Sequence, residues 1–261
     1  MPVLGIDIGS RTIKLVELEG TTIVRQQVVD SGHNPIQLAR RLVGNPERYG
    51  RIVATGYGRH AAKATFAHDL VTEIMAHATG AKFLFPHCRT VIDIGGQDSK
   101  VIKLGEGGQV EDFLMNDKCA AGTGKFLETM QRALELPLTI LAERAMAAQS
   151  YIRITSMCTV FAETEVVSLL NRERPVEEIA KGVIFSIGER ISGMVARIGA
   201  TPDVVFTGGV AQIPGMGRLL RECVGLRELL VPDCPQIVGA LGAALCAHAK
   251  EARVEGVGQA T

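Results

Sequence analysis

The sequence predicts an α/β protein built from two similar halves. Short apolar runs alternate with longer amphipathic segments, as expected where strands and helices follow one another. Hydrophobic residues make up 46% of the 261 residues, which is enough for a substantial core. The segment LGIDIGSRTIKLVEL at 4–18 is repeated in outline by VIDIGGQDSKVIKL at 91–104. The repeat has a spacing of about 86 residues and aligns Asp7 with Asp93, Gly9 with Gly95 and Lys14 with Lys100. Two such halves facing each other would bind a ligand in the cleft between them.

The first half is predicted to begin as a hairpin meander that helices then cover. Alternating apolar residues and the turn signal at Glu19–Gly20 define its strands, and a longer period defines its helices. The predicted elements are the strands Val3–Ile8, Thr12–Leu18 and Thr22–Val29, the helix Pro35–Val43, the strand Ile52–Thr55 and the helix Glu73–Leu84.

The second half follows the repeated strands with more helix. Its predicted elements are the helices Gly124–Leu136 and Thr139–Gln149, the strand Ile152–Thr155, the helices Thr159–Leu170 and Pro175–Gly199, the strand Val204–Thr207, the helix Met216–Val224, the strand Leu229–Val231 and the closing helix Ile237–Ala252. We expect the tail at 256–261 to be disordered. We expect residues 1–85 with the closing 239–261 to form the first half, and 86–238 the second.

Composition and charge exclude several classes of function. Lys and Arg number 28, and so do Asp and Glu, so there is no electrostatic footprint for nucleic acid or an anionic membrane. Tryptophan is absent, which argues against stacking on bases or sugars. No run approaches the roughly 20 apolar residues that cross a bilayer, and the N-terminus does not have the pattern of a signal peptide. We expect a cytoplasmic protein.

Both repeated segments, and TGGVAQ at 207–212, have the form of phosphate-binding turns. Glycine lets the backbone approach a phosphate closely, and successive N–H groups form a nest for an anion. Ser10 and Thr12 add hydroxyl groups, and Asp7 can hold Mg²⁺, usually through water. GTGK at 122–125 is not a Walker loop, since that pattern needs glycine where Cys119 stands and Ser or Thr where Phe126 stands. A dinucleotide-binding Rossmann fold is excluded as well, because no G-x-G-x-x-G follows the first strand.

The six cysteines include no CxxC pair, and free thiols are expected in a reducing compartment. We expect Cys88, Cys223, Cys234 and Cys246 to be small buried hydrophobic residues. Cys119 and Cys158 differ, because each stands at a predicted helix start, where partial positive charge stabilises an anionic cluster. A 4Fe-4S cluster needs four thiolates, so two chains related by a two-fold axis would supply a whole site. On spacing alone, two buried thiols remain an alternative.

Six motifs together resemble one family. LGIDIGS, ATGYGR, VIDIGGQDSKVI, MNDKCAAGTGKFLE, CTVFAETEV and TGGVAQ are similar to the ATP-dependent activators of 2-hydroxyacyl-CoA dehydratases, a family that includes the ATPase subunits of benzoyl-CoA reductase. The resemblance runs from Leu4 to about Ala247. It implies duplicated ribonuclease-H-like halves of the acetate and sugar kinase, Hsc70 and actin superfamily, which close over ATP.

The resemblance also implies the roles of individual residues. It places nucleotide contacts at Gly9, Ser10, Arg11, Thr12, Ile13, Gly95, Gly96, Gln97, Gly208, Gly209, Gln212 and Gln236, catalytic roles at Asp7, Asp93 and Gln97, and cluster ligands at Cys119 and Cys158. Family members usually carry small or hydroxyl residues where Arg11 and Ile13 stand. Arg11 reaches a phosphate or points to solvent, and Gln97 either orients the attacking water or caps its turn.

The function implied is an ATPase that drives an electron uphill. One 4Fe-4S cluster per homodimer, with ATP or ADP and Mg²⁺, would serve a one-electron donor to a partner iron–sulfur enzyme such as a 2-hydroxyacyl-CoA dehydratase. A ferredoxin or flavodoxin-like protein would supply the electron. An activating subunit of benzoyl-CoA reductase or of another low-potential cluster protein is one alternative. A small-molecule kinase of the same fold, or a regulatory ATP-binding module, is another.

Overall fold

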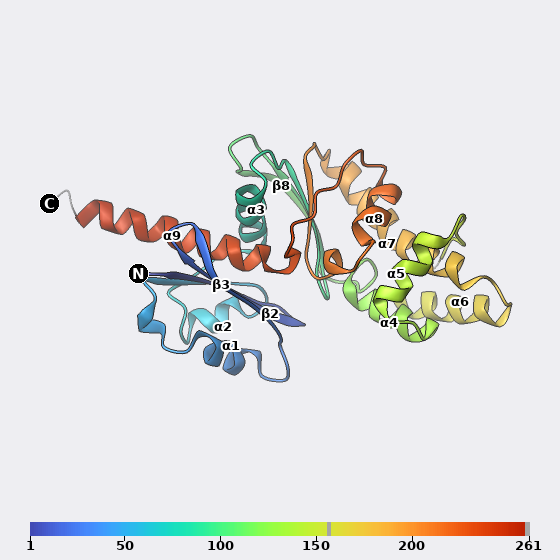
Figure 1. Ribbon diagram of the computed structural model, residues 1–261, viewed down its shortest axis with the longest axis horizontal. Helices are drawn as coiled ribbons and strands as arrows, with labels where there is room; N and C mark the ends of the chain where they lie inside the picture. The colour runs from blue at the N-terminus through green and yellow to red at the C-terminus, as the bar shows by residue number, and fades with distance from the viewer. Residues whose placement is uncertain (156–157, 259–261) are drawn as a thin grey trace. The chain divides into compact units, whose positions relative to one another are not determined.

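The structure, a computed structural model, describes residues 1–155 and 158–258 (Figure 1). Its contacts divide the chain into two compact units. Unit 1 comprises Met1–His87, Glu106–Val110 and the chain from Gln236 onward. Unit 2 comprises Cys88–Gly105 and Glu111–Pro235. The first unit is therefore discontinuous in sequence, and its last part follows the whole of the second.

Unit 1 is organised around a five-stranded sheet with the strand order β3-β2-β1-β4-β5. β1 pairs antiparallel with β2 and parallel with β4, so the sheet is mixed. Its elements are β1 (Val3–Ile8), β2 (Thr12–Glu19), β3 (Thr22–Asp30), α1 (Pro35–Val43), η1 (Pro46–Arg48), β4 (Arg51–Thr55), α2 (Arg59–Lys63), β5 (Asp69–Leu70), α3 (Glu73–Leu84), η3 (Pro235–Ile237, which begins at the last residue of unit 2) and α9 (Val238–Gly258).

Helices cover both faces of this sheet (Figure 1). On one face, α1 and α2 pack on the side chains of Leu4 and Ile6. On the other face, α9 packs on Val3 and Val16, and α3 packs on α9. The approach of α9 to β1 is so close that a Cβ at Gly5 would stand 2.0 Å from the Ala240 carbonyl oxygen. A side chain at this position would therefore push the closing helix off the sheet.

Unit 2 contains a four-stranded sheet with the order β8-β7-β6-β9. A single large core joins this sheet to the helices, and α7 contributes much of it through a buried face that includes Ile184 and Ile187. The elements are β6 (Thr90–Ile94), β7 (Ser99–Leu104), β8 (Val110–Asn116), α4 (Gly124–Leu134), α5 (Leu138–Ala147), α6 (Thr159–Asn171), α7 (Val176–Ile198), β9 (Val204–Thr207), η2 (Val210–Gln212) and α8 (Met216–Val224).

The internal repeat predicted from the sequence is present as two matching hairpins. β1 pairs with β2 so that Asp7 lies opposite Lys14, and β6 pairs with β7 so that Asp93 lies opposite Lys100. Local signals explain several boundaries. For example, Asn34 caps α1, where its Oδ1 accepts a hydrogen bond from the Gln37 N–H at 3.2 Å.

The predicted strand Ile152–Thr155 is wrong, because this segment forms no ladder. Its backbone groups bond to helices instead of to a neighbouring strand. The N–H of Ile152 donates to the carbonyl of Glu178, and the N–H of Thr155 donates to the carboxylate of Glu165 at 3.0 Å. The segment is an irregular connection pinned to α6 and α7.

The predicted strand Leu229–Val231 is reduced to an isolated bridge between Leu230 and Val205. Pro232 follows directly and has no N–H group with which to extend the pairing. The strand β8 was not predicted, because its half-exposed sequence VEDFLMN is too acidic for a buried strand.

The tail predicted to be disordered is helical at 256–258, where α9 continues, while 259–261 lie outside the described residues. Among the described residues, none of the helices combines the length and apolar character that crossing a membrane requires.

Candidate functional site

The first predicted phosphate loop is the tight turn between β1 and β2 in unit 1. The Gly9 N–H donates to the Thr12 carbonyl at 3.1 Å, which closes the turn. Ser31 braces it from β3, since its hydroxyl donates to the Gly9 carbonyl at 2.8 Å. Ser10 and Arg11 are exposed at the tip. Ile13 differs from its neighbours, because its side chain is fully buried in the core and only its backbone could approach a ligand.

Asp7 ends β1 directly before this turn. The side chain is only 6% exposed, and Lys14 Nζ donates to Oδ2 at 3.0 Å. The ion pair stabilises a carboxylate that would otherwise be costly to bury.

The second predicted phosphate loop, between β6 and β7 in unit 2, repeats this arrangement. Lys100 is 1% exposed, and its Nζ donates to Asp93 Oδ2 at 3.2 Å and to Asp98 Oδ2 at 2.6 Å. The Gly95 N–H donates to the Asp98 carbonyl at 2.9 Å and closes the turn. Gln97 is exposed at the tip.

The third predicted loop follows β9, and part of it meets the second loop. Thr207, the last residue of β9, donates from Oγ1 to Asp93 Oδ1 at 2.9 Å. Gly208 is buried, Gly209 half-buried, and Gln212 exposed at the end of η2. The fourth predicted residue of this group, Gln236, is half-buried and lies in unit 1.

The second loop is also bonded to the start of α4. The N–H of Gly124 donates to the Gly95 carbonyl at 2.9 Å, and the N–H of Lys125 donates to the Gly96 carbonyl at 2.8 Å. These N–H groups belong to the first turn of α4, where they have no partner within the helix. The loop and the helix therefore form one hydrogen-bonded unit.

The two predicted cluster ligands, Cys119 and Cys158, precede the helices α4 and α6. Cys158 is exposed and is the N-cap residue of α6. Cys119 is half-buried in the turn between β8 and α4, so it lies before the helix start rather than at it. Asn116 braces that turn, because its Nδ2 donates to the carbonyls of Cys119 at 3.0 Å and Ala121 at 2.9 Å.

All four other cysteines were expected to be buried, and the structure confirms this fully for Cys88 alone among them. Cys88 is buried, Cys223 and Cys246 are half-buried, and Cys234 is exposed. Burial raises the pKa of Cys223 to about 11 and also raises the pKa of Cys246, so burial favours the neutral thiol at both positions. The described residues contain no group of three or more His, Cys, Asp or Glu side chains that could hold a metal.

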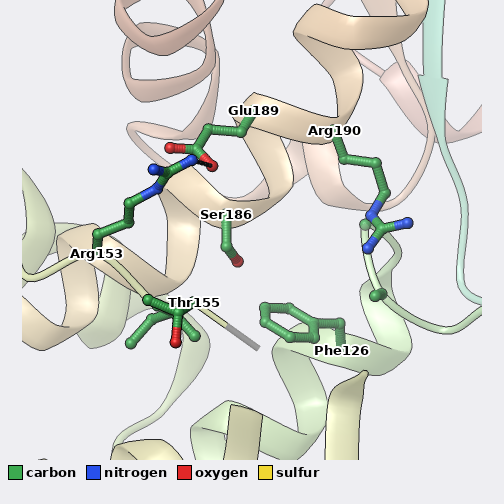
Figure 2. A pocket seen from close by; sticks show the side chains of 9 residues that line it. Phe126, Arg153, Thr155, Ser186, Glu189 and Arg190 are labelled. Carbon is green, nitrogen blue, oxygen red and sulfur yellow. Dashed lines mark hydrogen bonds and ion pairs between the residues drawn. The ribbon is translucent and has the colours of Figure 1, made fainter. Parts of the chain in front are cut away.

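Unit 2 also has a cavity of about 440 Å³ beside the cysteine turn (Figure 2). Arg153 and Glu189 face each other at its edge and form an ion pair of 3.2 Å. Arg190 reaches over the turn, where a Cβ at Gly122 would stand 2.6 Å from its Cδ. The cavity is lined by Ala121, Gly122, Phe126, Arg153, Ile154, Thr155, Ser186, Glu189 and Arg190.

The sequence reading did not identify these cavity residues. Ser186, Glu189 and Arg190 resemble ordinary helix positions, although their i, i+3 and i+4 spacing puts them on one face of α7. That spacing is the only signal that could have suggested them, and it is common in helices.

The sequence profile of the BadF/BadG/BcrA/BcrD ATPase family matches residues 4–247. Two relatives are similar over almost their whole length. The 2-hydroxyisocaproyl-CoA dehydratase activator of Clostridioides difficile is 42% identical, covering 98% of each chain. The (R)-2-hydroxyglutaryl-CoA dehydratase activating ATPase of Acidaminococcus fermentans is also 42% identical, covering 96% of this chain and 98% of that protein.

Solved structures support the same fold. The activator of the 2-hydroxyisocaproyl-CoA dehydratase from Clostridium difficile with bound ADPNP superposes with a TM-score of 0.89 at 41% identity, covering 98% of this chain and 97% of that chain. The ROK hexokinase from Thermus thermophilus shares the fold at 16% identity, with a TM-score of 0.52 and coverage of 96% and 99%. The predicted fold class is confirmed.

Proposed function

Because the chain belongs to the BadF/BadG/BcrA/BcrD ATPase family, we propose that it is a reductive activator of a 2-hydroxyacyl-CoA dehydratase. It is an ATPase by family, and the resemblance predicted from its motifs is confirmed. In the proposed reaction, one electron passes from a reduced ferredoxin or flavodoxin through the activator to the iron–sulfur centre of the partner, while ATP and water become ADP and phosphate. The observation that carries the coupling is the pair of hydrogen bonds between the second loop and α4.

The nucleotide part of the proposal rests on the three loops. We assign phosphate contacts to the backbone N–H groups that follow Gly9 and Gly95 in these turns, because the N–H groups of Gly9 and Gly95 already bond to carbonyls within the turns. Asp7 and Asp93 are carboxylates of the kind that hold hydrated Mg²⁺. Gln97, exposed at the tip of its loop, orients the attacking water.

The adenosine end of the nucleotide is assigned to the third loop and to Gln236. Gly208 and Gly209 let the backbone approach a ligand closely. The side-chain amides of Gln212 and Gln236 offer hydrogen bonds to it.

The proposed iron–sulfur site rests on two cysteines of this chain, which would supply half of the ligands of a 4Fe-4S cluster. Such a cluster, when bound, stores and releases one electron. Cys119 and Cys158 provide two thiolates, so a second copy must provide the other two. The first turn of α6 exposes Val160 to 65% and Phe161 to 67% beside Cys158. A second copy seated at Cys158 would cover these apolar side chains, as homodimer interfaces do.

The loop–helix bonds explain how ATP would act on the cysteines. Phosphate contacts at Gly95 and Gly96 fix the peptides whose carbonyls hold the first turn of α4. A change in the loop therefore shifts α4 and the turn that carries Cys119. α6, which carries Cys158, packs on α4 through the shared core of unit 2. A nucleotide that favours one loop conformation thus favours one arrangement of both ligands.

We propose a cytoplasmic location, which fits the six free thiols. The alternative to a dehydratase as partner is another iron–sulfur reductase, such as a benzoyl-CoA reductase. An assay that supplies reduced ferredoxin and ATP to each candidate partner in turn separates these alternatives.

The experiment that tests the proposal measures iron, acid-labile sulfide and mass on protein purified without oxygen. We expect about four iron and four sulfide per dimer. Cys119→Ser and Cys158→Ser should each lose the cluster while retaining ADP binding. Serine is a good N-cap residue, so the start of α6 should survive the second substitution. Cys234→Ser is the matched control, since Cys234 is also exposed but is not a proposed ligand. Iron-free monomer after anaerobic reconstitution would overturn the proposal.

A further inference from the structure

The two units share a four-residue arrangement that extends beyond the repeated hairpins. In each unit an aspartate lies near the end of a central strand, β1 or β6. It pairs with a lysine on the antiparallel neighbour and with a threonine on the parallel neighbour. A glycine directly follows the threonine. We call these sets the first quartet and the second quartet. The first quartet is Asp7, Lys14, Thr55 and Gly56, and the second quartet is Asp93, Lys100, Thr207 and Gly208.

The glycines show how closely the two quartets correspond. Gly56 has φ +84°, and a Cβ there would stand 2.3 Å from Asp7 Oδ1 and 2.6 Å from the Ile8 carbonyl oxygen. Gly208 has φ +93°, and a Cβ there would stand 2.8 Å from Asp93 Oδ1 and 2.4 Å from the carbonyl oxygen of Ile94. Ile94 directly follows Asp93, just as Ile8 directly follows Asp7. Both positions need a left-handed backbone and no side chain, so one local geometry has been built twice.

The quartets differ in the hydroxyl group of the threonine. Thr207 Oγ1 donates to Asp93 Oδ1 at 2.9 Å, and both oxygens of Asp93 are therefore bonded. Thr55 is fully buried, yet its Oγ1 has no hydrogen-bond partner in the described part of the chain. Asp7 is bonded by Lys14 at Oδ2. Buried hydroxyl groups are almost always paired, so an unpaired one at this register position points to a partner from outside the chain.

We propose that the Thr55 hydroxyl is a positioning group for the hydrated cation of the nucleotide, and that Asp7 rather than Asp93 is the carboxylate that holds it. This inference rests on the proposed nucleotide function. Thr55 bonds a water molecule of the cation's shell and fixes its orientation beside Asp7. In the second quartet the same hydroxyl is already bonded to Asp93, which leaves that carboxylate less able to accept a cation's water. The duplicated sites have thereby become unequal.

Two isosteric substitutions test this assignment. Thr55→Val removes a hydroxyl that has no hydrogen-bond partner among the described residues, so we expect the melting temperature of the ligand-free protein to be unchanged or higher. Thr207→Val removes the donor to a buried carboxylate oxygen, so we expect that melting temperature to fall. Valine keeps the β-branched shape that both strands carry at these positions.

The second readout is the dissociation constant of ADP with Mg²⁺ and with EDTA. Thr55→Val should weaken binding about tenfold in Mg²⁺, the loss of one good hydrogen bond, and leave binding in EDTA unchanged. Thr55→Ser, which keeps the hydroxyl, should restore binding in Mg²⁺. A lower melting temperature for ligand-free Thr55→Val, or unchanged ADP binding in Mg²⁺, would overturn the assignment. Wild-type protein that gains no ADP affinity from Mg²⁺ would instead refute the magnesium part of the proposed function.

Discussion

The Gly124 N–H donates a hydrogen bond of 2.9 Å to the Gly95 carbonyl, so the helix after the cysteine turn begins on the predicted phosphate loop. A Cβ at Gly124 would stand 3.1 Å from that carbonyl oxygen and 3.3 Å from the Cα of Gly96. Both contacts are tighter than a side chain normally makes. The absence of a side chain at this position is therefore part of the connection between loop and helix.

Gly124→Ala should uncouple ATP hydrolysis from electron transfer. The added methyl group pushes α4 away from the loop, and displacements of about 1 Å can cost roughly 100-fold in a positioned reaction. We expect about a tenfold or greater fall in electrons delivered per ATP, with hydrolysis much less affected. The measurement compares phosphate release with reduction of the partner.

The control for this variant is Gly193→Ala in α7, where an added Cβ would have no atom of the described residues within 4 Å. Alanine favours helix, so this control should be slightly more stable and fully coupled. If the Gly124→Ala protein delivers as many electrons per ATP as the Gly193→Ala protein, the hydrogen bonds between the second loop and α4 do not couple ATP hydrolysis to electron transfer.

Asn116→Ala should weaken retention of the cluster without changing nucleotide affinity. The Asn116 amide holds the carbonyls of Cys119 and Ala121, and its loss frees the turn that presents the thiol. We expect iron to be released several-fold faster to a chelator, followed by absorbance under anaerobic conditions. Asn34→Ala, which removes the cap of α1 in unit 1, is the control and should release iron at the wild-type rate. Equal release rates for the two variants would assign no bracing role to Asn116.

Lys100→Met should destabilise the protein more than Lys14→Met. Lys100 is 1% exposed and forms ion pairs with Asp93 and Asp98, so its loss takes the cation away from the buried carboxylate of Asp93. Breaking such a pair costs about 3–5 kcal/mol. The Lys14 side chain is 15% exposed and has one carboxylate partner, for which we expect about 1–2 kcal/mol. Urea unfolding followed by circular dichroism measures both, and equal losses would contradict the difference in burial.

The thiol of Cys223 should resist alkylation at pH 8 in the folded protein. Burial, with Glu189 and Glu222 nearby, raises its pKa from 9.0 to about 11, so thiolate is scarce. Its modification should rise about tenfold per pH unit toward pH 11. Exposed Cys158 in cluster-free protein should react readily. Mass spectrometry of digested protein identifies the labelled residue, and early labelling of Cys223 at pH 8 would contradict this environment.

The same pKa shift has a consequence for stability. The folded state holds the Cys223 proton more tightly than the unfolded state does. Below about pH 9 the thiol is protonated in both states, so it does not make the free energy of unfolding depend on pH. As the pH rises from 9.0 toward 11, the unfolded state releases the proton first, and the free energy of unfolding falls. Cys223→Ala should reduce this alkaline loss of melting temperature.

The hairpins were predictable because Asp, Gly and Lys recur in the same order. In both segments the apolar runs on either side of the Gly-containing turn are typical of two paired strands. The edge strand β8 was not predictable in this way, since its acidic residues face solvent. The segment before Thr155 carries a strand-like sequence, but its N–H groups bond to helices. Tertiary contacts outweighed local propensity there.

The candidate site was predictable only where it is local in sequence. The turns at Gly9 and Gly95 are short motifs, and a glycine-containing turn after a strand is typical of phosphate binding. The pair of Arg153 and Glu189, by contrast, joins a loop to a distant helix and has no spacing signature. The unequal bonding of Thr55 and Thr207 appears only when both side chains are in place, because the surrounding sequences ATG and FTG are almost the same.

The closing helix α9 belongs to unit 1, although the whole of unit 2 precedes it in the chain. During synthesis, the sheet face that contains Val3 and Val16 must wait for α9 before it is covered. About 150 residues separate His87 from the start of α9, which corresponds to roughly 8–30 s at ordinary rates of translation. The nascent chain therefore exposes an apolar sheet surface while unit 2 folds. This surface is where a molecular chaperone would bind the growing chain.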